Sequence, residues 1–181
     1  MNIETYLNEL IEREGGYVND PADRGGATRY GITEAVARAH GYKGHMRDLP
    51  KDLAKTIYRK TYWTNPRFDQ VNQIHAAVAE ELLDTGVNCG VAFAKPLLQR
   101  ALNLLNNQGK EGWPDLAVDG IYGPATLNAL NAFLKKRGKD GAQALLRVLN
   151  IMQGQRYIEI CERNPSQEKY FFGWVLNRVV I

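Results

Sequence analysis

The 181 residues have an ordinary globular composition, with 44% hydrophobic and 24% charged side chains. A chain of this length can bury a sizeable core without disulfides or structural metals. The net charge of +3 is too small to argue for nucleic acid as a partner. No apolar run approaches the ~20 residues that span a bilayer, and the start, Met1 to Thr5, has no basic or apolar segment of a signal peptide. We therefore expect a soluble chain, made in the cytoplasm, without an integral membrane segment.

Metal and thiol chemistry find little support in the sequence. Cys89 and Cys161 lie far apart without a C-x-x-C spacing, which favours buried free thiols over a disulfide or a zinc site. His40, His45 and His75 show no spacing of the H-E-x-x-H kind, which argues against a zinc amidase or peptidase. No G-x-S-x-G elbow points to acyl transfer. We expect neither a metal nor a cofactor.

The first half predicts short helices around a turn-rich segment. Apolar residues from Ile3 to Ile11 follow the spacing of an amphipathic helix, which Gly15-Gly16 ends. Residues 17–32 have no helical period and predict turns with a short hairpin. Helices are expected to resume at about 33–40, 51–62 and 72–85, and Asn88-Cys89-Gly90 predicts a break between the two halves.

The second half is also predicted to be helical. One helix face carries Phe93, Leu97, Ala101, Leu104 and Leu105, and a polar loop follows over 106–120. Another helix starts at Gly123-Pro124, a long helix over 145–160 stops at Asn164-Pro165, and a final helix carries Tyr170, Phe171, Trp174 and Val175. The chain is therefore predicted to be mainly α.

Glu14 is the first candidate for chemistry. It lies three and four positions beyond Ile11 and Leu10, so we expect it to continue the buried stripe of the first helix. It also ends that helix, where the negative end of the dipole disfavours a charged carboxylate. Both effects favour a proton donor, although a Glu that swings into solvent at a helix end is the plainer interpretation.

The segment after Glu14 offers further polar groups. Asp20, Asp23 and Thr28 lie in a turn-rich stretch, and eight residues separate Glu14 from Asp23. Cleavage of a glycosidic bond needs an acid for the leaving oxygen and usually a second carboxylate near the anomeric carbon. Asp23 could supply that carboxylate, and Thr28 could hold a water. Capping of local turns explains Asp20 nearly as well.

The residues from Glu14 to Pro21, followed by Asp23-x-Gly25-Gly26-x-Thr28-x-Tyr30-Gly31-Ile32-Thr33, resemble the signature of the glycoside hydrolase family 108 muramidases. The resemblance implies a lysozyme-like helical fold with a short hairpin near the active site, and Glu14 as the catalytic acid. It also suggests substrate contacts from Asp20 and Tyr30. The Glu-x8-Asp spacing is similar to the broader phage-lysozyme pattern of Glu, Asp and Thr, except that four residues, not five, separate Asp23 from Thr28.

Two later stretches are similar to the rest of that family's domain, namely Tyr58-x-x-x-Tyr62-Trp63 and Leu83-Asp84-x-x-Val87-Asn88-x-Gly90. Aromatic faces such as those of Tyr62 and Trp63 can stack on sugar rings, although core packing at helical spacing is the commoner explanation. Asp84 and Asn88 could reach a cleft from a helix end. We name these four residues as candidate substrate contacts.

The C-terminal half resembles a peptidoglycan-binding domain. The similarity rests on Leu98-Gln99-x-Ala101-Leu102-Asn103 and on Val118-Asp119-Gly120-Ile121-Tyr122-Gly123-Pro124-x-Thr126. We therefore predict a catalytic domain over 1–90 and a helical peptidoglycan-binding-like region over 91–181, packed against it. The resemblance implies a lysozyme that cleaves the β-1,4 bond of murein, as in prophage endolysins.

Two other functions stay open. A lytic transglycosylase works with a single Glu and forms an anhydro-sugar, and a non-catalytic wall-binding or secretion-assisting protein would need no acid at all. In each case we expect a monomer whose partner is bacterial peptidoglycan. A holin or another export partner would have to release it to the cell wall in the periplasm.

Overall fold

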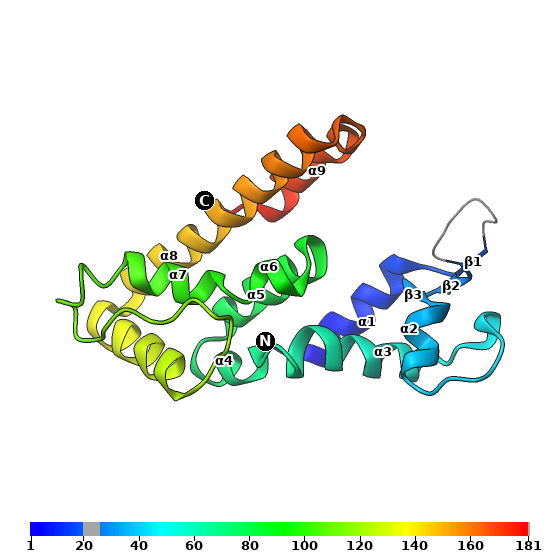
Figure 1. The fold of residues 1–181 in the computed structure, drawn as a ribbon, viewed down its shortest axis with the longest axis horizontal. Coiled ribbons are helices and arrows are strands. Elements are labelled where there is room, and N and C mark those ends of the chain that lie inside the picture. Colours follow the sequence, from blue (N-terminus) through cyan, green and yellow to red (C-terminus); the bar gives the residue numbers. More distant parts are fainter. Residues whose placement is uncertain (20–25, 181) are drawn as a thin grey trace. The chain divides into compact units, whose positions relative to one another are not determined.

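A computed structural model describes residues 1–19 and 26–180, and the chain forms two compact units, Asn2–Trp63 and Thr64–Ile181. Helices dominate both units (Figure 1). The one described sheet has three short antiparallel strands, so the predicted mainly α, lysozyme-like fold with a short hairpin is confirmed. In the described part of the chain no helix is long and apolar enough to cross a membrane.

Helix α1 (Ile3–Glu14) begins at Asn2, whose side chain accepts a hydrogen bond from the Glu4 N–H, and ends at Gly15. Its apolar face, formed by Leu7, Leu10 and Ile11, is buried. That face packs beside α3 (Lys51–Arg59), which continues as a π-helical turn over Lys60–Thr64. The predicted helix over 51–62 is therefore present, with a change of helical type near its end.

A small sheet follows α1 in the order β1 (Tyr17–Val18), β2 (Thr28–Arg29) and β3 (Ile32–Thr33). Tyr30 and Gly31 join β2 to β3, both with positive φ (52° and 72°), which is the two-residue hairpin turn that matches strand twist. Thr33 caps α2 (Glu34–Ala39), and a 3-10 turn, Met46–Asp48, precedes α3.

The second unit begins with α4 (Phe68–Ile74) and α5 (Ala76–Cys89), so the single helix predicted over 72–85 is wrong. The chain becomes extended at His75 (φ −151°, ψ 109°), and the His75 ring nitrogen accepts a hydrogen bond from the Val78 N–H. A capping side chain thus starts a new helix inside an apolar pattern that looked continuous. Helix α5 ends at Gly90, within the stretch where the sequence predicts a break between the halves.

Three further helices build the core of this unit: α6 (Val91–Ala94), α7 (Leu97–Leu104) and α8 (Pro124–Arg163). Helix α8 packs on α5 and α7 and contains a sharp break at Gly138 (φ 57°, ψ −142°). Leu104 was predicted on the buried face of α7 but is 72% exposed, because the helix ends there. The chain closes with a 3-10 turn, Pro165–Gln167, and α9 (Glu168–Arg178).

The predicted polar loop after α7 has no regular helix or strand before α8, yet it is well anchored. The Gln99 side chain is 2% exposed and donates to Asp119, Ile121 and Thr126, while it accepts from the Gly120 N–H. One buried amide therefore satisfies the polar groups of the turn. The predicted preference of Asp119-Gly120 for a turn agrees with the positive φ of Gly120.

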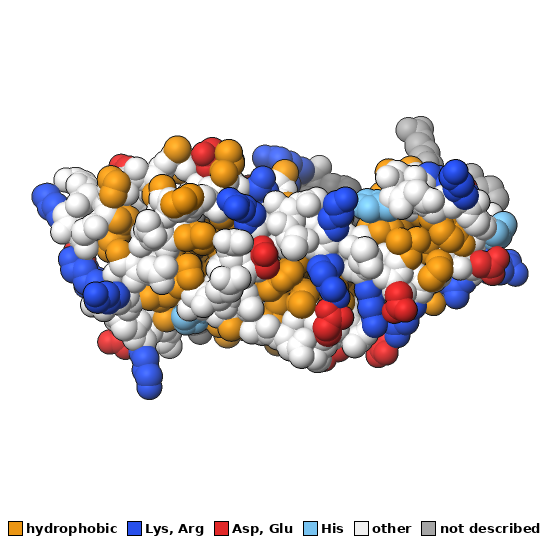
Figure 2. All heavy atoms as spheres, turned by 90° about the horizontal axis from the view of Figure 1, so that it is seen from below, with side chains coloured by type: hydrophobic (Ala, Val, Ile, Leu, Met, Phe, Trp, Pro, Cys, Tyr) orange, Lys and Arg blue, Asp and Glu red, His pale blue; other side chains and the backbone are white. Residues whose placement is uncertain are grey.

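One face of the molecule shows charges of both signs. On the face that Figure 2 shows, Lys and Arg side chains alternate with acidic and apolar ones. Cys89 and Cys161 are free thiols, as the sequence predicts, and the expected burial holds for Cys161 but not for Cys89, which is partly exposed.

Candidate active site

Glu14 lies at the last position of α1, over the turn that joins β2 to β3. A Cβ built on Gly31 would stand 2.8 Å from Glu14 Oε2 and would also collide with Tyr58 Oη. Glu14 Oε2 and Tyr58 Oη therefore lie directly beside the backbone of Gly31, where only glycine leaves room for them. Glycine also suits the positive φ of this position.

The expectation that Glu14 is buried is wrong, because its side chain is exposed. The stripe of Leu7, Leu10 and Ile11 is covered, but α1 ends one turn later and nothing in the described part of its unit covers the last turn. The surroundings of the carboxylate come from the hairpin turn and from two tyrosines, not from an apolar pocket.

Tyr58 and Tyr62 occupy successive turns at the end of α3, with ring centroids 5.6 Å apart in a stacked arrangement. Tyr58 is 5% exposed and donates a 3.1 Å hydrogen bond to the Tyr30 carbonyl. Burial, then the charge of Glu14, then Tyr62 raise the pKa of the Tyr58 phenol, and burial followed by Glu14 raises the pKa of Tyr62. Both phenols therefore stay protonated at physiological pH.

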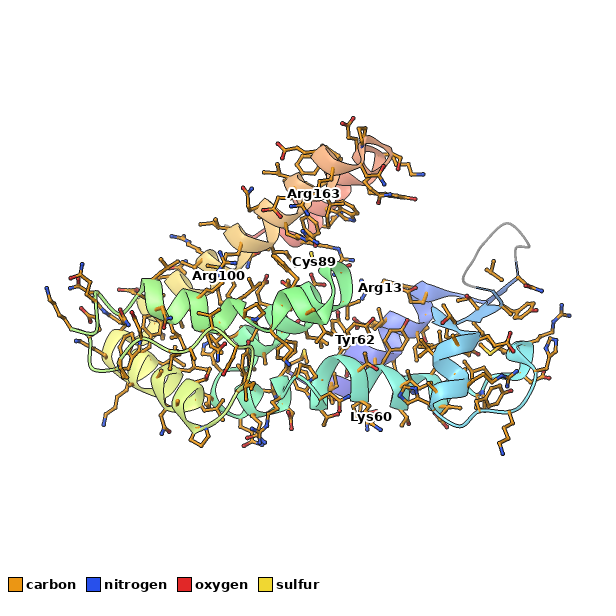
Figure 3. The ribbon with its side chains drawn as sticks, in the orientation of Figure 1. Arg13, Lys60, Tyr62, Cys89, Arg100 and Arg163 are labelled. Carbon is orange, nitrogen blue, oxygen red and sulfur yellow. The ribbon has the colours of Figure 1, made fainter. Side chains whose placement is uncertain are left out.

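The Tyr58 hydroxyl proton is already used by a backbone carbonyl. Tyr58 uses its one proton on the Tyr30 carbonyl, so its oxygen retains lone pairs beside the Glu14 carboxyl. The π-helical turn that carries Tyr62 is a feature that often marks functional sites in helices. Figure 3 labels Tyr62 and, at the end of α1, Arg13.

A groove of about 380 Å³ lies within the same unit and is lined by Gly15 and Gly16, which directly follow Glu14 in the chain. Gly15 and Gly16 form one side, Tyr17 and Tyr30 contribute aromatic rings, and cations come from Arg29, Arg47 and Lys51. The sequence had indicated Tyr30 alone among these side chains. The cations come from separate elements, and a shared groove of this kind leaves no local pattern in the sequence.

The other predicted residues are placed as follows. Asp20 and Asp23 lie outside the described residues. Thr28 lies in β2, and its hydroxyl donates to the Gly26 carbonyl at 3.3 Å. Trp63 is only 5% exposed, so its burial supports the packing role over sugar stacking, whereas Tyr62 is partly exposed.

Asp84 and Asn88 lie on α5, in the second unit. Arg178 donates to one Asp84 carboxylate oxygen at 2.6 Å and Gln153 to the other at 3.0 Å. Asn88 donates to the Asp84 carbonyl. Both carboxylate oxygens of Asp84 thus take part in packing α8 and α9 against α5.

Comparison with known proteins finds two family models that match this chain. Residues 7–90 match the family model described as "Glycosyl hydrolase 108", and residues 93–179 match "Predicted Peptidoglycan domain". The two matches meet near the predicted boundary at residue 90, whereas the compact units divide at Trp63, because α4 and α5 pack with the C-terminal half. The division of domains at residue 90 stays a prediction.

A search of curated proteins finds no match. Among solved structures, one titled "Structure of Brucella abortus SagA" is 25% identical, with a TM-score of 0.60. The similarity covers 96% of this chain and 87% of that one. It therefore extends over both units and not over the Glu14 segment alone. Residues 7–90 of this chain are thus similar to glycosyl hydrolase 108 domains and residues 93–179 to peptidoglycan domains, and the two matches together indicate a peptidoglycan hydrolase.

Proposed function

We propose that the protein is an N-acetylmuramidase, a lysozyme that hydrolyses the β-1,4 bond of murein with Glu14 as the general acid. The observation that carries the proposal is the position of Glu14 on the Gly31 backbone, beside two protonated phenols, in the segment that matches glycosyl hydrolase 108. A carboxyl that is exposed and lies beside neutral hydroxyls can reach the leaving oxygen of a bound sugar.

The remaining roles follow from the chemistry of the bond. Asp23 is proposed as the second carboxylate, which stabilises the positive charge that develops at the anomeric carbon. Thr28 is proposed to hold the attacking water. Tyr62 offers a partly exposed ring to a sugar, and Asp20, Tyr30, Asp84 and Asn88 are proposed as further contacts with the glycan.

The peptidoglycan domain supports the cell wall as the place of action. We further propose that the protein works as a monomer, that a holin or other export partner lets it reach the wall, and that wall cleavage serves lysis of a bacterium by a prophage. Peptidoglycan itself is the partner that both family matches support.

The test is analysis of the products released from purified murein by the wild type and by Glu14→Gln. We expect the wild type to release fragments with muramic acid at the reducing end, and the variant to lose ~10²–10⁴-fold or more in rate, because it has no proton to give. Glu9→Gln is the matched control, since Glu9 is an exposed residue on the same helix.

Each alternative has its own product pattern. Anhydro-muramic ends would assign the protein to the lytic transglycosylases. No cleavage by a folded wild type would favour a wall-binding role. If Glu14→Gln stays within threefold of the wild type, Glu14 is not the acid.

A further inference from the structure

The groove that Gly15 and Gly16 border carries more cations than carboxylates in its lining. Arg29 comes from β2, Arg47 from the 3-10 turn and Lys51 from the first turn of α3, and all three line the same groove. Glu12, also in the lining, has a single contact with Lys51 at 3.5 Å. Three cations facing one carboxylate leave this small volume with an excess of positive charge.

The two arginines are held by aromatic rings. The Arg29 guanidinium lies 5.0 Å from the centroid of the Tyr30 ring and donates to the Tyr30 hydroxyl at 3.2 Å. The Arg47 guanidinium lies 5.0 Å from the centroid of the Tyr17 ring. A cation–π contact engages the face of a guanidinium, so N–H groups other than the one that Arg29 gives to Tyr30 can meet a ligand. Those edges match the two oxygens of a carboxylate.

From this we infer that the groove of Arg29, Arg47 and Lys51 binds the carboxylates of the lactyl-peptide substituent on the muramic acid next to the scissile bond. The inference rests on the proposed function, because it takes murein as the substrate. The sugar backbone is uncharged, whereas the peptide attached to each muramic acid carries free carboxylates. Gly15 and Gly16 border the groove immediately after Glu14, so a bound carboxylate lies near the reacting centre.

The inference predicts that the protein distinguishes native murein from murein whose carboxyl groups have been converted to amides. Binding is measured by cosedimentation with insoluble murein, in the Glu14→Gln background so that no cleavage occurs. We expect native murein to bind more tightly than amidated murein. Arg47→Gln and Lys51→Gln should each weaken binding to the native polymer about twofold to fivefold, and their combination about tenfold. Added salt should reduce the preference.

Lys43→Gln is the matched control, because Lys43 is an exposed cation of the same unit that does not line the groove. It changes net charge as Lys51→Gln does and should keep the preference for native murein. Thermal unfolding of each variant checks that the fold is retained. The inference would be overturned if Glu14→Gln without a groove substitution bound native and amidated murein equally. It would also be overturned if Lys43→Gln and Lys51→Gln lost the same amount of binding to native murein.

The two proposals fail in different ways. If the wild type cleaves murein but does not distinguish native from amidated murein, the groove does not bind carboxylates and the muramidase proposal stands. If the wild type releases no sugar fragments yet prefers native murein through Arg47 and Lys51, the proposed reaction is wrong and the groove remains a carboxylate site.

Discussion

Substitution of Gly31 by alanine separates the position of Glu14 from the mere presence of its carboxylate. The added methyl would stand 2.8 Å from Glu14 Oε2, and ordinary contact begins at 3.4 Å, so the carboxylate has to retreat by about 0.6 Å. Tyr58 Oη lies even nearer to the methyl and has to move as well. A displacement of about 1 Å can cost ~10²-fold in rate, so we expect kcat to fall about tenfold to hundredfold.

Backbone strain is a separate effect with its own control. Gly31 has φ +72°, and alanine in this region costs about 1 kcal/mol whatever its surroundings. Gly41 has φ +84° with nothing within 4 Å of a built Cβ, so Gly41→Ala carries the strain without the collision. Dye release from labelled murein gives kcat, and thermal unfolding gives the stability of both variants.

The two variants should lose similar stability and differ in activity. If Gly31→Ala keeps a kcat within threefold of Gly41→Ala, the carboxylate does not depend on this contact, and the description of the hairpin turn as its support is refuted.

Two more predictions concern other carboxylates. Asp23→Asn should lower kcat more than Asp20→Asn in the same dye-release assay, because Asp23 has the spacing of the second catalytic carboxylate, and the reverse order would give that role to Asp20. Burial, followed by the charge of Asp84, raises the pKa of Glu81 from 4.5 to about 7. Between these two pH values the folded state keeps a proton that the unfolded chain loses. The free energy of unfolding should therefore fall by about 1–3 kcal/mol as the pH rises from about 4.5 to about 7. Denaturant unfolding at pH 4 and pH 8 should show this loss of stability in the wild type and in the exposed control Glu80→Gln, but not in Glu81→Gln. An equal loss in all three proteins would refute the role of Glu81.

Local signals explain why much of the fold could be predicted. Asn2 and Gly15 are strong helix boundaries, Gly31 favours a hairpin turn, and Asn164-Pro165 stops a helix whatever surrounds it. The break at His75 was missed because apolar spacing continues across it and histidine is an uncommon capping residue. Its cap forms through a ring nitrogen, which no propensity encodes.

In the candidate site, too, some residues could be predicted from local sequence patterns and others could not. Glu14 could be named from its motif, yet its exposure could not, because that depends on which elements cover the last turn of α1. Tyr58 and Tyr62 share a helix spacing of four and could have been recognised as a stacked pair. Arg29, Arg47 and Lys51 come together only through folding, so their groove leaves no trace in sequence spacing.

The break in α8 affects how the second unit unfolds locally. A continuous helix of 40 residues would run about 60 Å and would share one ladder of hydrogen bonds from end to end. Gly138 interrupts that ladder, so the segments before and after it can lose their hydrogen bonds independently. Amide exchange should therefore divide at this glycine into two cooperative groups. The segment before Gly138, where Thr126 accepts from Gln99 of α7, would then exchange at its own rate, without waiting for the segment after it, where Tyr157 stacks on Trp174 of α9.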